Sequence, residues 1–199
     1  PAVALTDHGT MFGVIEFFNS ARAVGVHPVI GLEAYLAPRR RGEREAKLDK
    51  SAYHMLLLAE NDTGYQNLLK IASTAQLEGF YYNPRIDREF LAAHSEGLIA
   101  TSGCMSAEVP RAIIEHGVDM ARRKLDWYFD VFGPDRFFLE LQKHPIAELD
   151  TINRTLLDVG KHFNARYVAT NDAHYIYKED ARYQDILLAI QTGSLLTDP

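Results

Sequence analysis

The chain has 199 residues, with 21 lysines and arginines against 27 aspartates and glutamates, so its formal net charge is −6. Its hydrophobic fraction of 47% and charged fraction of 24% are ordinary for a globular protein and exclude disordered and fibrous classes. The acidic balance argues against indiscriminate nucleic-acid binding. No apolar run approaches the roughly 18 residues of a membrane helix, and Cys104 has no partner for an internal disulfide. We expect no membrane association and a reducing, cytoplasmic compartment.

Short apolar runs of strand character alternate with helical patterns along the chain. The expected strands cover 2–5, 29–36, 53–59, 98–101, 137–141 and 167–170. The expected helices cover 11–24, a segment capped by Asp62 that includes 65–72, a short segment capped by Asp87, 107–115, 119–132, 146–163 and 178–191.

This repeated alternation predicts parallel βα units, arranged as an open doubly wound sheet or as a barrel. The first strand is not followed by a Gly-x-Gly-x-x-Gly motif, and the sequence has no Walker-type loop. Nucleotide-binding versions of the open sheet therefore lose support. We expect an α/β barrel, or part of one, as a single domain over residues 1–199. The chain opens on a strand already in progress and closes on a turn signal, so we expect a fragment of a longer protein.

Residue types that bind metals stand at the ends of several expected strands. Four strands are followed by an Asp, His or Cys, the second strand carries a Glu, and a His stands near the start of the third. The C-terminal ends of parallel strands open on one face of a barrel, so we expect these side chains to converge there. The candidates are Asp7, His8, Glu33, His54, Cys104, His144, Asp172 and His174.

Such a set suits divalent metal ions. Imidazole and carboxylate groups accommodate Zn²⁺ or Mn²⁺, and a thiolate favours Zn²⁺. Crowded without a cation, these groups would repel one another or change their pKa values. Two neighbouring ions can activate a water and brace a phosphate ester. Each residue also has a simpler interpretation, because Asp7 or Asp172 could cap a helix, Cys104 could be a small buried hydrophobe, and the others could be strand-edge or solvent-facing residues.

Several segments, taken in order, resemble one known family. They are ALTDHG at 4–9, GLEAY at 31–35, YHMLLLA at 53–59, EGFYYNPRID at 78–87, SGC at 102–104, LELQKH at 139–144, VATNDAHY at 168–175 and IQTGSL at 190–195. Together they resemble the polymerase-and-histidinol-phosphatase (PHP) domain of bacterial DNA polymerase III alpha subunits. The resemblance spans essentially the whole chain, and the segment at 78–87 with the final segment separates it from free-standing PHP phosphatases.

The resemblance implies a distorted (βα)7-type barrel with a metal cluster at the C-terminal ends of its strands. It implies Zn²⁺ or Mn²⁺, with Mg²⁺ also possible, held by Asp7 or His8 together with the other candidates. Glu33 would be the bridging carboxylate, and Asp7, Glu33 and Asp172 would be the catalytic residues. The family's first motif, His-x-His, is absent from residues 1–199. The barrel is therefore expected to lack its first strand, and the metal site to be only partly occupied.

The resemblance leaves three functions open. The first is a metal-dependent phosphodiesterase that trims the 3′ end of a DNA primer, as a 3′–5′ proofreading exonuclease. The second is a structural module that docks the rest of the polymerase chain or a separate proofreading exonuclease subunit. The third, which the polymerase-like segments disfavour, is a histidinol-phosphatase-like phosphatase. In each polymerase case, residues 192–199 would begin the connection to the polymerase part.

Overall fold

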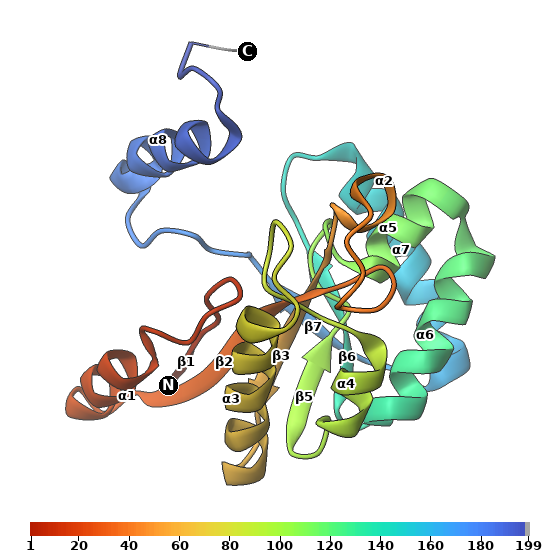
Figure 1. Ribbon diagram of the computed structural model, residues 1–199, viewed down its shortest axis with the longest axis horizontal. Helices are drawn as coiled ribbons and strands as arrows, with labels where there is room; N and C mark the ends of the chain where they lie inside the picture. The colour runs from red at the N-terminus through yellow and green to blue at the C-terminus, as the bar shows by residue number, and fades with distance from the viewer. Residues whose placement is uncertain (198–199) are drawn as a thin grey trace.

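The computed structural model describes residues 1–197 and contains one mixed sheet of seven strands (Figure 1). The strands run in the spatial order β1-β2-β3-β5-β6-β7. The short strand β4 pairs with β2, as β1 does, but farther along β2. Their bounds are β1 Ala2–Leu5, β2 His27–Leu36, β3 Tyr53–Ala59, β4 Arg85–Ile86, β5 Leu98–Thr101, β6 Phe137–Gln142 and β7 Arg166–Thr170.

Helices connect the strands and cover one side of the sheet (Figure 1). Their bounds are α1 Val14–Ala23, α2 Ala46–Asp49, α3 Asp62–Leu77, α4 Arg88–Ala93, α5 Glu108–His116, α6 Val118–Phe132, α7 Ala147–Val159 and α8 Ala181–Thr192, with 3₁₀ helices at Gly160–Phe163 and Lys178–Asp180. In Figure 1, α8 stands apart from the other helices, and none of its residues is buried. None of the described helices has the length and apolar character needed to cross a membrane.

The architecture confirms the expected incomplete α/β barrel. In the described part of the chain, β1 and β7 lie at opposite ends of the strand order and do not pair with each other. The sheet is therefore curled but open between β1 and β7.

Of the predicted connecting segment 192–199, residues 198–199 lie outside the described residues.

The expectation of uniformly parallel strands is wrong for β3. This strand runs antiparallel to β2 and to β5, whereas β1–β2, β5–β6 and β6–β7 are parallel pairs. The beginning of β3 consequently lies at the same rim as the ends of the parallel strands. A pattern of apolar residues indicates that a strand is present but not the direction in which it runs. The antiparallel direction of β3 could therefore not be predicted from the sequence.

Alternation along the strands separates a helix-covered core from the interior of the open barrel. Leu32, Ala34 and Leu36 of β2 are buried in the core with Leu57 of β3. The helices supply the other half of this core through residues at helical spacing, such as Leu68, Ile71 and Ala75 of α3. The intervening strand residues face the barrel interior, where the candidate ligands lie.

Two helix starts illustrate the local determinants. Asp87 caps α4 as predicted, since its carboxylate accepts a hydrogen bond of 3.0 Å from the Phe90 N–H. The cap predicted at Asp62 is wrong, because the preceding Asn61 accepts the bond from the Gly64 N–H instead. Both caps are residue types whose short side chains reach the free N–H groups of a first turn.

The charged loop 38–50 is tied down by ion pairs and by one buried arginine. Arg85 is fully buried and donates hydrogen bonds to the carbonyl groups of Gly79, Asp49, Arg41 and Glu43. The Arg41 guanidinium pairs with Asp87 at 3.2 Å and so links the loop to the start of α4. These contacts hold the base of the loop beside β4.

Candidate metal centre

β1 and β2 place His8 opposite Glu33. The two residues form a parallel bridge, and the flanking backbone bonds, Gly9 N–H to Glu33 C=O and Glu33 N–H to Asp7 C=O, measure 2.9 and 3.0 Å. Directly paired residues of parallel strands point to the same face. His8 Nε2 accordingly lies 3.8 Å from Glu33 Oε2.

His54 reaches the same rim because β3 is antiparallel. It pairs with Tyr35, two residues beyond Glu33 and on the same face of β2. The Nδ1 atom of His54 lies 2.7 Å from Oε1 of Glu33, and the two side chains are 24% and 12% exposed. His54 thus belongs with the residues at the strand ends, although it stands near the beginning of its own strand.

Cys104 joins this group from the loop after β5. Its Sγ atom lies 3.6 Å from Nδ1 of His54 and 3.9 Å from Oε1 of Glu33. The preceding Gly103 has a φ of +73°, and a Cβ there would lie 2.7 Å from the side chain of Ala107. Glycine at this position lets the loop turn tightly and bring the thiol to the cluster.

The mutual contacts of these groups change their proton affinities. Burial alone would raise the pKa of Glu33, but the hydrogen bond from His54 and the nearby imidazoles outweigh it and lower that pKa. Burial would lower the pKa of His54, yet the bonds to Cys104 and Glu33 raise it to about 10. Burial, together with the Glu33 charge, raises the pKa of Tyr35, whose hydroxyl lies 3.4 Å from His8 Nδ1. The Glu33 carboxylate and the neighbouring imidazoles therefore favour one another's charged forms.

The remaining candidates lie around this cluster at different distances. The ring centroid of His174 is 5.8 Å from that of His8. Asp172, which has a φ of +49°, lines the interior cavity together with Glu33 and Cys104. His144 does not line that cavity. It lies on an adjoining groove with Asp172 and His174.

Asp7 faces away from the cluster. A Cβ placed on Gly13 would lie 3.3 Å from Oδ2 of Asp7, which puts this carboxylate on the α1 side of β1. Ala4 and Thr6 line the interior cavity, and alternation from them points His8 inward and Asp7 outward. Of these two adjacent candidates, the structure places His8 beside Glu33 and turns Asp7 away from it.

The cavity beneath the cluster has a volume of about 310 Å³ and contains one acidic residue that the list of candidates omitted. This residue is Glu140 of β6, which is 5% exposed. In the sequence, Glu140 is the single carboxylate within the otherwise largely apolar strand Phe137–Gln142. Buried acidic groups in strands are rare unless they have partners, and this alternation could have marked Glu140.

The donor set fits a divalent metal ion. Ligand atoms of His8, Glu33 and His54 all lie within 4.8 Å of one another, and the Cys104 thiol adjoins two of them. Nitrogen, carboxylate oxygen and sulfur are ligands of Zn²⁺, and the carboxylate and imidazoles also suit Mn²⁺. The arrangement can therefore hold a metal ion at the mouth of the barrel.

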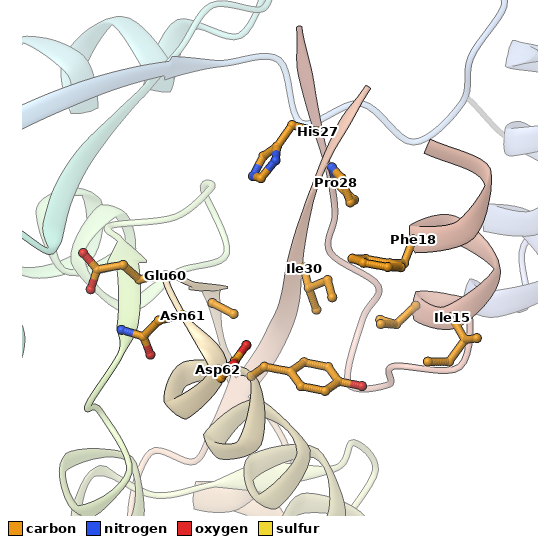
Figure 2. A pocket seen from close by; sticks show the side chains of 11 residues that line it. Ile15, Phe18, His27, Pro28, Ile30, Glu60, Asn61 and Asp62 are labelled. Carbon is orange, nitrogen blue, oxygen red and sulfur yellow. The ribbon is translucent and has the colours of Figure 1, made fainter. Parts of the chain in front are cut away.

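A second, larger pocket lies away from this centre, between α1, β2 and α3 (Figure 2). Its volume is about 420 Å³, and its lining includes Phe18, His27, Ile30, Glu60 and Asp62. None of the candidate ligands lines it. The predicted ligands therefore do not involve this pocket.

Comparison with known proteins identifies the family of this chain. The PHP domain family matches residues 1–144. The chain is 49% identical over its full length to DNA polymerase III subunit alpha of Thermus aquaticus, 44% identical over 98% of its length to that of Borreliella burgdorferi, and 43% identical over its full length to that of Deinococcus radiodurans. It spans 15–17% of the length of these three relatives. The chain belongs to the PHP domain family.

Proposed function

We propose that this chain is the PHP domain of a replicative DNA polymerase III alpha subunit, and that its metal centre hydrolyses phosphodiester bonds at a DNA 3′ end. The observation that carries the proposal is the convergence of His8, Glu33, His54 and Cys104 from four separate segments at one rim. Similarity to polymerase alpha subunits along the full chain supports the placement in a replication protein. A cytoplasmic location and a polymerase remainder as partner follow from that placement.

The roles of the residues follow from their chemistry. His8, Glu33, His54 and Cys104 would hold the ion, with Zn²⁺ favoured by the thiol and Mn²⁺ as the alternative. A divalent ion in such a site supplies an activated water and offsets the charge of a phosphate ester. Asp172 lines both the cavity and the outer groove, and His174 lines the groove, so the two would position the incoming strand end there. Glu33 contacts both histidines and would be the central carboxylate.

The direct test uses the full-length protein and a single DNA strand labelled near its 3′ end. With Mn²⁺ or Zn²⁺ we expect stepwise shortening of the strand, and Glu33→Gln should abolish it. The matched control is Glu108→Gln, which changes a buried glutamate whose carboxylate pairs with Arg88 and Lys124 and not with the cluster. The absence of any shortening beyond that of Glu33→Gln would contradict the phosphodiesterase proposal.

The same preparation separates the other functions. A docking module would bind metal and melt at lower temperature after chelation, yet degrade no DNA. A small-molecule phosphatase would release phosphate from histidinol phosphate and leave the labelled strand intact. DNA polymerase activity of each variant, measured in parallel, shows that the rest of the protein is folded.

A further inference from the structure

Glu140 is the buried carboxylate at the floor of the barrel mouth. Three side chains donate hydrogen bonds to it: the Thr101 hydroxyl to Oε2, and the Thr170 hydroxyl and Gln142 amide to Oε1. The hydrogen bond from the Gln142 side-chain amide measures 2.9 Å. These donors stand at the ends of β5, β6 and β7, so a single carboxyl group joins three neighbouring strands at the rim where the ligand loops begin.

Both threonines lead directly into loops that carry candidate ligands. The Thr101 hydroxyl oxygen also accepts a hydrogen bond of 3.2 Å from the Gly103 N–H, next to Cys104. Thr170 is the last residue of β7 and stands two residues before Asp172. A shift of Glu140 would therefore be transmitted to the thiol on one side and to the carboxylate loop on the other.

The charge environment of Glu140 differs from that of a comparably buried glutamate. Glu108 is also 5% exposed, but it pairs with Arg88 and with Lys124. Within residues 1–197, Glu140 forms no ion pair with a lysine or arginine. A buried carboxylate without a cation is costly, and a cation in the adjoining cavity would offset that cost.

We propose that Glu140 is a positioning residue of the metal centre, which sets the positions of the Cys104 and Asp172 loops through Thr101 and Thr170. This proposal rests on the metal site put forward above and adds a residue that does not touch the ion. Outer partners of this kind orient metal ligands, and their loss commonly weakens metal binding about 10–100-fold.

The test is a Co²⁺ titration of the full chain, because a cobalt–thiolate bond gives a charge-transfer absorption that reports on Cys104. For Glu140→Gln we expect Co²⁺ affinity to fall about 10–100-fold and the charge-transfer absorption per bound ion to weaken. Glu108→Gln is the matched control, and we expect it to lower thermal stability while it leaves affinity and absorption unchanged. Thr101→Val, which removes one hydroxyl and keeps the carboxylate, should weaken the absorption as well.

The outcomes separate this inference from the proposed function. Wild-type affinity and absorption in Glu140→Gln would overturn the positioning role and leave the metal site standing. Failure of the wild-type chain to bind Co²⁺ would overturn both. If Glu140→Gln does not fold, Thr101→Val decides, and an unchanged absorption in that variant rejects the role. An equal loss in Glu108→Gln would also reject it, because the effect would then be one of general stability.

Discussion

Alternation along β1 determines which of two adjacent metal-binding residue types faces the cavity. Ala4 and Thr6 line the interior, so His8 follows them inward while Asp7 turns toward α1. The motif that contains both residues was evident from the sequence, but its inward member was not. Small residues such as Ala4 and Thr6 carry too weak a hydrophobic signal to indicate the face of a short strand.

This geometry predicts different effects for two neighbouring substitutions. His8→Asn should lower Zn²⁺ affinity at least about tenfold, because it removes a nitrogen ligand next to Glu33. Asp7→Asn should leave the affinity close to wild type, because the Asp7 carboxylate points away from the cluster. Isothermal titration calorimetry with Zn²⁺ measures the affinity of each variant. Equal losses would show that Asp7 also reaches the ion.

At the scale of elements, sequence periodicity located most helices and strands to within a few residues. The strand at Tyr53–Ala59 was predicted with its observed bounds, and the short helix after Asp87 starts where its cap indicated. Expected helix 146–163 instead divides into α7 and the 3₁₀ helix Gly160–Phe163. The direction of β3 depends on pairing with β2 and β5, which are long-range contacts that no local pattern encodes.

The link between α4 and the charged loop gives a pH-dependent prediction. Burial would raise the pKa of Asp87, but N–H groups of Phe90 and Arg41 and the Arg41 guanidinium lower it below its ordinary value of 3.8. A lowered folded-state pKa stabilises the protein above pH 3.8, and this contribution is lost as the pH falls through the folded-state value. Asp87→Asn keeps the cap and removes the charge, so it should cost about 1–3 kcal/mol at pH 7.

Urea unfolding of wild type and Asp87→Asn at several pH values measures this difference. It should be largest at neutral pH and shrink as the pH falls below about 4. Asp150→Asn is the control, because Asp150 forms an exposed pair with Lys143 at 2.6 Å. Such pairs contribute little, so we expect almost no change. A difference for Asp87→Asn that does not vary with pH would show that the charge is unimportant.

For the whole molecule, the open sheet and the position of α8 mark the limits of prediction from sequence. The βα alternation indicated an α/β barrel, and the family resemblance indicated that it is incomplete. The helical pattern over 178–191 was also correct in type. Its placement was not predictable, because the apolar side chains of α8, including Tyr183, Leu187 and Ile190, remain largely exposed and do not join the hydrophobic core of the described residues.

The metal centre joins segments that are far apart in the sequence, so an ion bound there should stabilise the entire fold. His8, Glu33, His54 and Cys104 come from the segment after β1, from β2, from β3 and from the loop after β5. A ligand that binds only the folded state at 100 times its Kd adds about 2.7 kcal/mol. For a protein of this size, that corresponds to a rise in melting temperature of roughly 5–10 °C.

Calorimetry with Zn²⁺ and then with excess chelator should show this rise and its reversal. His54→Ala should abolish the rise, since it removes the side chain that contacts both Glu33 and Cys104. His162→Ala is the matched control, because His162 is hydrogen-bonded to Arg122 and lies before the start of β7, away from the barrel mouth. This variant should retain the rise. An equal rise in His54→Ala would place the stabilising ion elsewhere, and the convergence of distant side chains at the rim would then have to be explained without a metal.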